Sequence, residues 1–89
     1  MMDVKQWSVG VVIDEHDGRT RAKARLSASD KPEMVGVGLA RLNPEDADVP
    51  AIGDELATAR ALADLSHQLI EATAADIEEV TKQPSNLYS

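Results

Sequence analysis

Four basic side chains recur at every second position in one segment of this 89-residue chain: Arg19, Arg21, Lys23 and Arg25. Residues two apart on a β-strand share a face and lie about 6.6 Å from one another. That distance is close to the spacing of successive phosphates along a nucleic-acid strand. The pattern therefore predicts a basic row, made of these four residues, that is able to contact phosphates.

Two other interpretations of the basic row remain open. The outward face of a strand in a soluble protein is ordinarily polar, and Lys or Arg there discourages pairing with other strands. A row of this sign also suits docking on an acidic surface of a second protein chain. Four basic residues with no acid between them exceed what solubility alone requires.

The sequence gives little indication of a metal site or of a catalytic site. Residues Asp14, Glu15, His16 and Asp17 cluster in one turn, but they lack the full twelve-residue loop with its terminal Glu that a calcium site needs. We therefore expect a solvated hairpin end and no metal. The chain has two His, and Ser66 and His67 would point apart on a helix. No strained nucleophile turn occurs, so we expect no enzyme.

The chain also has no phosphate-cradling loop, because Gly36-x-Gly38 lacks a third glycine and a helix start. We therefore predict no cofactor and no small-molecule substrate. Cysteine is absent, which excludes disulfides and thiolate chemistry. The N-terminal residues do not resemble a signal peptide, and the apolar stretches are too short to span a bilayer, so we expect a cytoplasmic protein without membrane contact.

Composition indicates one domain, residues 1–89, with a thin aliphatic core, since the chain has no Phe, one Trp and one Tyr. A thin core favours self-association, and we expect a homodimer. The net charge of −7 argues against non-specific nucleic-acid binding. Charge is unevenly distributed, however: residues 1–41 carry +1 and residues 42–89 carry −8.

Alternation of apolar and polar residues predicts strands at about 6–14, 19–27 and 34–42. Asp17-Gly18 is a hairpin turn signal. A turn with an even number of residues pairs odd positions of the first strand with even positions of the second. Two apolar sets then share a face, and the basic row lies on the other: Trp7, Val9, Val11 and Ile13 with Thr20, Ala22, Ala24 and Leu26.

In the third strand we expect Val35, Val37 and Leu39 to face the core. The other face would then carry Gly36 and Gly38, and glycine is costly inside a strand unless something gains from the missing side chain. Either the flat face accommodates the long basic side chains, or another molecule approaches closely. Gly36 and Gly38 therefore join the basic row as candidate binding residues.

The second half of the chain predicts an acidic connector from Asn43 to about Pro50, a long amphipathic helix at about 51–72 and a short helix at about 74–82. Thr73 and Asp76 resemble a capping box for the short helix. Residues 83–89 form a tail. The predicted core-facing stripe of the long helix is Ile52, Leu56, Ala59, Leu62, Ser66, Leu69 and Ile70, widened by Ala63 and Leu65. The fold class is α+β: a three-stranded antiparallel sheet followed by two helices.

Four blocks occur together and in order: IDEHDGRTRAKARL, VGVGLARLNP, IGDELATARALADL and DIEEVTKQP. In these blocks the chain resembles a small actinobacterial family that includes proteins induced in mycobacterial dormancy. The resemblance implies a fold like that of double-stranded-RNA-binding domains, a likeness to ribosome hibernation-promoting factors, a dimeric stress protein and no catalytic residues.

Two hypotheses follow. In the first, the protein is a non-enzymatic binding module that associates with ribosomes or structured RNA through the basic row. In the second, it is a homodimeric protein-interaction module without an RNA partner, in which the basic row meets carboxylates of a second chain.

Overall fold

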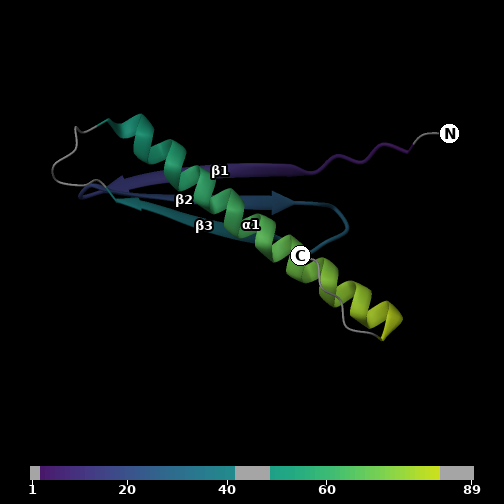
Figure 1. Cartoon of the computed structure of the whole chain (residues 1–89). Helices are drawn as coiled ribbons and strands as arrows, with labels where there is room; N and C mark the ends of the chain where they lie inside the picture. The colour runs from purple at the N-terminus through teal and green to yellow at the C-terminus, as the bar shows by residue number, and fades with distance from the viewer. Residues whose placement is uncertain (1–2, 42–48, 83–89) are drawn as a thin grey trace.

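Three antiparallel strands and one long helix make up the computed structural model, which describes residues 3–41 and 49–82. In chain order the elements are β1 (Ser8–His16), β2 (Arg19–Ser27), β3 (Met34–Arg41) and α1 (Pro50–Thr81). The strands form one sheet in the order β1-β2-β3. Figure 1 shows α1 lying diagonally across one face of this sheet, with its C-terminal part projecting beyond the strands. The predicted α+β class is confirmed, and the helix leaves the opposite face of the sheet open.

The β1–β2 hairpin has the predicted register. Asp17 and Gly18, with φ of 50° and 73°, form a two-residue turn between His16 and Arg19. These positive φ values are those of a type I′ turn, for which Asp-Gly is favoured. Val11 is paired with Ala24 and Ile13 with Ala22, so the apolar sets of the two strands share the helix-covered side of the sheet. The basic row consequently lies on the open side.

The assignment of faces in β3 was wrong. Gly36 is paired with Ala24 and Gly38 with Ala22, so both glycines lie on the helix side and are buried. Val37 and Leu39 are on the open side, with 42% and 61% of their surface exposed. Because side chains alternate along a strand, the whole strand presents the opposite face from the one predicted.

A close approach of α1 explains the two glycines. A Cβ atom added at Gly36 would lie 2.6 Å from the backbone nitrogen of Leu65, and one at Gly38 would lie 2.8 Å from the backbone carbon of Arg60 and closer still to Ala57. The glycines therefore accommodate the helix backbone, which is the close approach expected for strand glycines, with the protein's own helix as the approaching group. Neither glycine is available to a binding partner.

The core is built almost wholly from small residues. Its buried members are Ala22, Ala24, Leu26, Ala40, Ala57, Ala61 and Leu65. The helix contributes Ala57, Ala61 and Leu65, at i, i+4 and i+8. Leu65 belongs to the predicted stripe, and Leu69 of that stripe packs against the core, whereas Ala57 and Ala61 were not predicted. Of that predicted stripe, Ile52, Leu56 and Leu62 are exposed. Only small side chains fit where the two backbones meet, so the larger apolar residues are displaced to the flanks of the helix.

One continuous helix replaces the two that were predicted. Thr73 is not an N-cap: it lies inside α1, and its hydroxyl donates a hydrogen bond of 2.8 Å to the carbonyl oxygen of Leu69 one turn earlier. The helix begins at Pro50, since the fixed φ of proline suits the first helical position. The predicted acidic connector and the tail at 83–89 fall largely or wholly outside the described residues. Within the part of the chain that is described, no helix has the length and hydropathy needed to cross a membrane.

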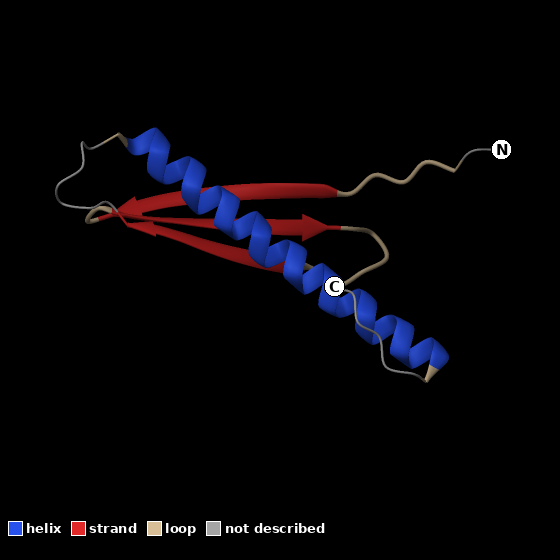
Figure 2. Ribbon diagram, in the orientation of Figure 1, coloured by secondary structure: helices blue, strands red, loops and turns tan. Residues whose placement is uncertain are grey.

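Polar side chains on one flank of α1 bind the backbone of β3. Asp64 accepts a hydrogen bond of 2.8 Å from the N–H of Val37. Arg60 donates to the carbonyl oxygen of Leu39 at 2.7 Å, and Gln68 donates to that of Val35 at 2.8 Å. These residues recur every four positions and so lie in a line along the helix. Figure 2 shows α1 crossing the sheet diagonally. The three hydrogen bonds place this line of side chains at the β3 edge of the sheet.

Candidate functional site: the open face of the sheet

The basic row lies along β2, the central strand, on the face that α1 does not cover. Arg19, Arg21 and Arg25 are exposed and Lys23 is half-buried. We use the term open face for the exposed side of the sheet, formed by alternate residues of the three strands. All four predicted binding side chains of β2 therefore share one surface, as the hairpin register required.

Two of the four basic side chains are already paired with acids. Arg21 donates to the Asp14 carboxylate from Nε at 3.2 Å and from Nη2 at 3.1 Å, across the β1–β2 ladder. Arg25 lies 3.4 Å from the Glu33 carboxylate, which comes from the loop between β2 and β3. Both pairs are about half exposed, so each contributes at most about 1 kcal/mol to stability. They nevertheless reduce the positive charge of the row.

Arg19 and Lys23 form no ion pair with any other described residue. Arg19 is directly opposite Arg41 in the β2–β3 register, so both side chains belong to the same end of the open face. Arg41 was not among the predicted binding residues, because the predicted orientation of β3 placed its odd-numbered residues on the core side. With that orientation corrected, period two places Arg41 on the same side as Leu39 and the basic row.

An aliphatic row runs beside the basic row on β3. It consists of Val35, Val37 and Leu39, and the register sets them opposite Arg25, Lys23 and Arg21. On the other side of Lys23 lies Val12 of β1, which is 68% exposed. The stem of Lys23 is thus flanked by two valines on the open face. This surface combines cationic and apolar groups, and the only aromatic ring that the described strands place on it is the imidazole of His16, directly opposite Arg19.

The acidic side chains at the hairpin end do not come together around a single site. His16 Nε2 lies 3.1 Å from the Asp17 carboxylate, while Asp14 is bound to Arg21. Among residues 3–41 and 49–82, no three His, Asp or Glu side chains are placed to hold a metal ion together. The hairpin end therefore carries exposed polar side chains that are not gathered around one cation.

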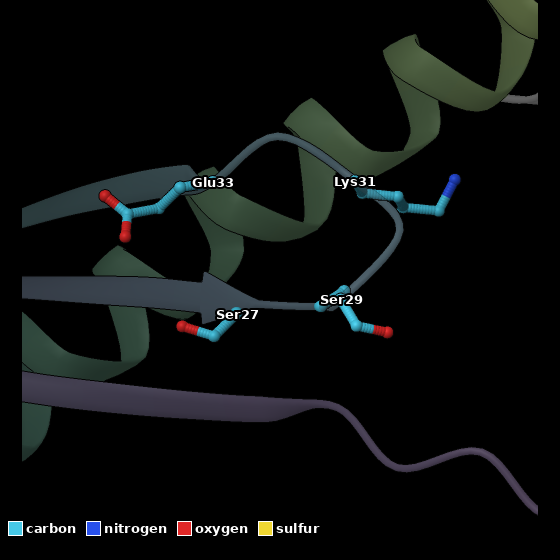
Figure 3. A pocket seen from close by; sticks show the side chains of 5 residues that line it. Ser27, Ser29, Lys31 and Glu33 are labelled. Atoms are coloured by element: carbon cyan, nitrogen blue, oxygen red, sulfur yellow. The ribbon is translucent and has the colours of Figure 1, made fainter.

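A hollow also lies beside the β2–β3 loop. It is lined by Ser27, Ala28, Ser29, Lys31 and Glu33. Figure 3 shows Lys31 and Glu33 pointing away from each other, and the two serines do likewise. Catalysis needs a nucleophile and a base within hydrogen-bond reach, and this hollow does not bring such groups together. The open face remains the better candidate for function.

The fold and this face define a small α+β protein with one sheet side covered by a helix and the other free. The chain belongs to the Rv2632c-like family, whose model matches residues 5–86. It is 60% identical over 80 residues to the uncharacterised protein Rv2632c of Mycobacterium tuberculosis, covering 90% of this chain and 85% of that one.

A second relative is the uncharacterised protein Mb1767 of Mycobacterium bovis, 57% identical over 84 residues, which cover 94% of this chain and 88% of the relative. The crystal structure of Rv2632c superimposes with a TM-score of 0.83 at 58% identity, covering 93% of this chain and 98% of that one. The order of three antiparallel strands and one long helix is therefore that of a solved family member.

Proposed function

We propose that this protein is a non-enzymatic, cytoplasmic binding module that takes an anionic partner on the open face, and that this partner is structured RNA, as on the ribosome. One observation carries the proposal: the basic row lies on an uncovered sheet face, and Arg19, Lys23 and Arg41 there have no carboxylate partner among the described residues. Cationic groups at strand spacing suit a phosphate backbone.

The resemblance to dormancy-induced proteins extends the proposal. It implies a fold like that of double-stranded-RNA-binding domains. It also implies a role under stress like that of ribosome hibernation-promoting factors. Recognition would rest mainly on phosphates and RNA shape, because the one aromatic ring that the described strands place on the open face is the His16 imidazole at the hairpin end. The acidic second half of the chain would restrict contact to this face.

Sedimentation with ribosomes across a salt series tests the proposal. The logarithm of the association constant should fall with the logarithm of salt concentration with a slope of about −2 to −4, as expected for a few phosphate contacts. Lys23→Glu should lower the affinity by at least about tenfold and make the slope shallower. Lys82→Glu makes the same change of charge at the end of α1, away from the open face, and should leave binding nearly unchanged. Absence of ribosome binding at low salt, or equal loss with both variants, would contradict it.

An acidic protein surface is the second candidate partner, favoured by the aliphatic row beside the basic row. Phosphates gain nothing from Val37 and Leu39, whereas a protein partner would bury them. Leu39→Ser separates the candidates, because Leu39 is 61% exposed and its loss should leave the fold intact. RNA binding predicts affinity within about twofold of the parent. A loss as large as that of Lys23→Glu would assign the contact to protein.

A further inference from the structure

Another hollow lies at the end of the sheet where β1 begins and β2 ends. Figure 1 shows the stretch before β1 and the β2–β3 loop leaving the sheet at this same end. The hollow has a volume of about 390 Å³, which is within the range of small-ligand sites. Both segments line it, through Val4, Lys5, Gln6, Trp7, Ser29 and Asp30. The single tryptophan of the chain therefore lies in a concave site outside the open face.

The Trp7 ring is restrained and still accessible. It keeps 44% of its surface exposed and does not belong to the core. Lys31 Nζ lies over the ring, 5.9 Å from its centroid, which is within reach of a cation–π attraction. A hydrogen bond of 3.4 Å from the N–H of Lys31 to the carbonyl oxygen of Ala28 closes a turn that positions Lys31. Lys31 does not line the hollow, so the ring borders the hollow with a part that Lys31 leaves uncovered.

The other lining groups suit the remaining parts of a nucleotide. Lys5 forms no ion pair within the part of the chain that the structure describes, so its ammonium group is available to a phosphate. The carboxylate of Asp30, which is likewise in no ion pair there, accepts hydrogen bonds of the kind that the amino group of a base donates. The hollow thus combines a ring for the face of a base, an acceptor for its edge and a cation for its phosphate.

The hollow lies close to one end of the basic row. Arg25, the last residue of that row, is opposite Gly10, and Trp7 is three residues before Gly10. The Cα atoms of Trp7 and Gly10 are therefore at most about 11 Å apart, which is less than twice the residue spacing of the basic row. An RNA strand whose phosphates follow the basic row consequently reaches the hollow within its next nucleotides. Figure 3 shows Lys31 extending beyond the ends of the strands at this end of the sheet.

We infer that Trp7 stacks on an unpaired nucleobase of the RNA that the open face holds, with Lys5 on the adjacent phosphate. The inference rests on the proposed function and adds to it a base contact beyond the end of the sheet. Loops and bulges offer unstacked bases, on which aromatic side chains of RNA-binding proteins stack, whereas the bases inside a duplex are not accessible in this way. The preferred partner is therefore a structured RNA with unpaired bases beside a stem.

The fluorescence of Trp7 reports the stack directly, because the chain has no other tryptophan. The probes are two RNA hairpins with the same stem. One has a loop of adenosines, whose bases stack well and carry an amino group, and the other has abasic residues in the loop, which keep every phosphate and remove the loop bases. The adenosine-loop hairpin should quench the Trp7 emission on binding. The abasic-loop hairpin should bind more weakly and leave the emission nearly unchanged.

Variants of Trp7 test the contribution of the ring to affinity, measured by fluorescence anisotropy of the labelled hairpins. Trp7→Leu should lower the affinity for the adenosine-loop hairpin at least about fivefold, and leave that for the abasic-loop hairpin within about twofold of the parent. Trp7→Phe retains a ring and should lose less than Trp7→Leu. Val4→Ala is the matched control, because Val4 lines the same hollow without a ring, and it should bind like the parent. Circular dichroism establishes that the variants are folded.

The results separate this inference from the proposed function. Equal quenching by the two hairpins overturns the inference, and so does equal affinity of Trp7→Leu and the parent for the adenosine-loop hairpin. If Lys23→Glu nevertheless weakens the binding of both hairpins, the proposed function stands without the base contact. If neither hairpin binds at low salt, the proposed function fails and the inference fails with it.

Discussion

Asp64 of α1 accepts a hydrogen bond of 2.8 Å from the backbone N–H of Val37 in β3, 27 residues earlier in the chain. Asp64 is also 3.3 Å from Nε2 of Gln68, which itself binds β3. The helix therefore holds the sheet in two ways: small residues pack beneath it, and polar side chains bind the strand edge beside it. The second contact aligns α1 along β3 and at the same time closes that edge.

Replacement of Asp64 should show what this bond contributes. Asp64→Ala removes the acceptor and should lower the free energy of unfolding by about 0.5–1.5 kcal/mol, the usual net value of one hydrogen bond. Asp64→Asn retains a carbonyl oxygen and should lie closer to the parent. Urea denaturation measures both. Glu55→Ala removes an exposed carboxylate elsewhere on α1 and should stay within about 0.5 kcal/mol; equal losses for Asp64→Ala and Glu55→Ala would refute the role of Asp64.

Gly38→Ala should destabilise the protein by about 1–3 kcal/mol, because its Cβ would meet the backbone of α1, which cannot move aside cheaply. Gly10→Ala is the matched control: a Cβ at Gly10 meets nothing within 4 Å. Thermal unfolding of the two variants measures the difference. If Gly38→Ala is as stable as Gly10→Ala, the helix does not pack as closely on β3 as described.

Asp14→Asn should strengthen RNA binding. The substitution releases Arg21 from its ion pair and removes a negative charge from the open face. An exposed pair of this kind is worth about 0.2–1 kcal/mol, so affinity for ribosomes at low salt should rise up to about fivefold while stability changes little. Glu55→Gln makes the same charge change on α1. A gain of equal size there would mean that net charge, and not the open face, governs binding.

Thr73→Ala distinguishes a continuous helix from two separate ones. Inside a helix, alanine is favoured over threonine by up to about 0.7 kcal/mol, so amides in residues 74–81 should exchange more slowly with solvent. At an N-cap the same change would cost about 1 kcal/mol and accelerate exchange. Hydrogen exchange followed by mass spectrometry shows whether exchange of these amides becomes slower or faster. Faster exchange would indicate that a second helix begins at Thr73.

Much of the hairpin could be predicted from the sequence because its determinants are local. Asp17-Gly18 specifies a two-residue turn, and a turn of known length determines which residues of β1 and β2 share a face. The position of the basic row on the outer side followed from that register alone. Its ion pairs did not, since Glu33 reaches Arg25 from a loop whose course the sequence does not reveal.

The orientation of β3 depended on tertiary structure. Hydropathy favours burying Val35, Val37 and Leu39, whereas the structure buries Gly36 and Gly38, because α1 approaches so closely that only backbone and small side chains fit between the layers. The same closeness selects Ala57 and Ala61 of α1 in place of Leu56 and Leu62. Sequence patterns thus determined the strands, the turn and the face of the basic row. Only the packing of helix on sheet decided that an aliphatic row and Arg41 lie beside that row.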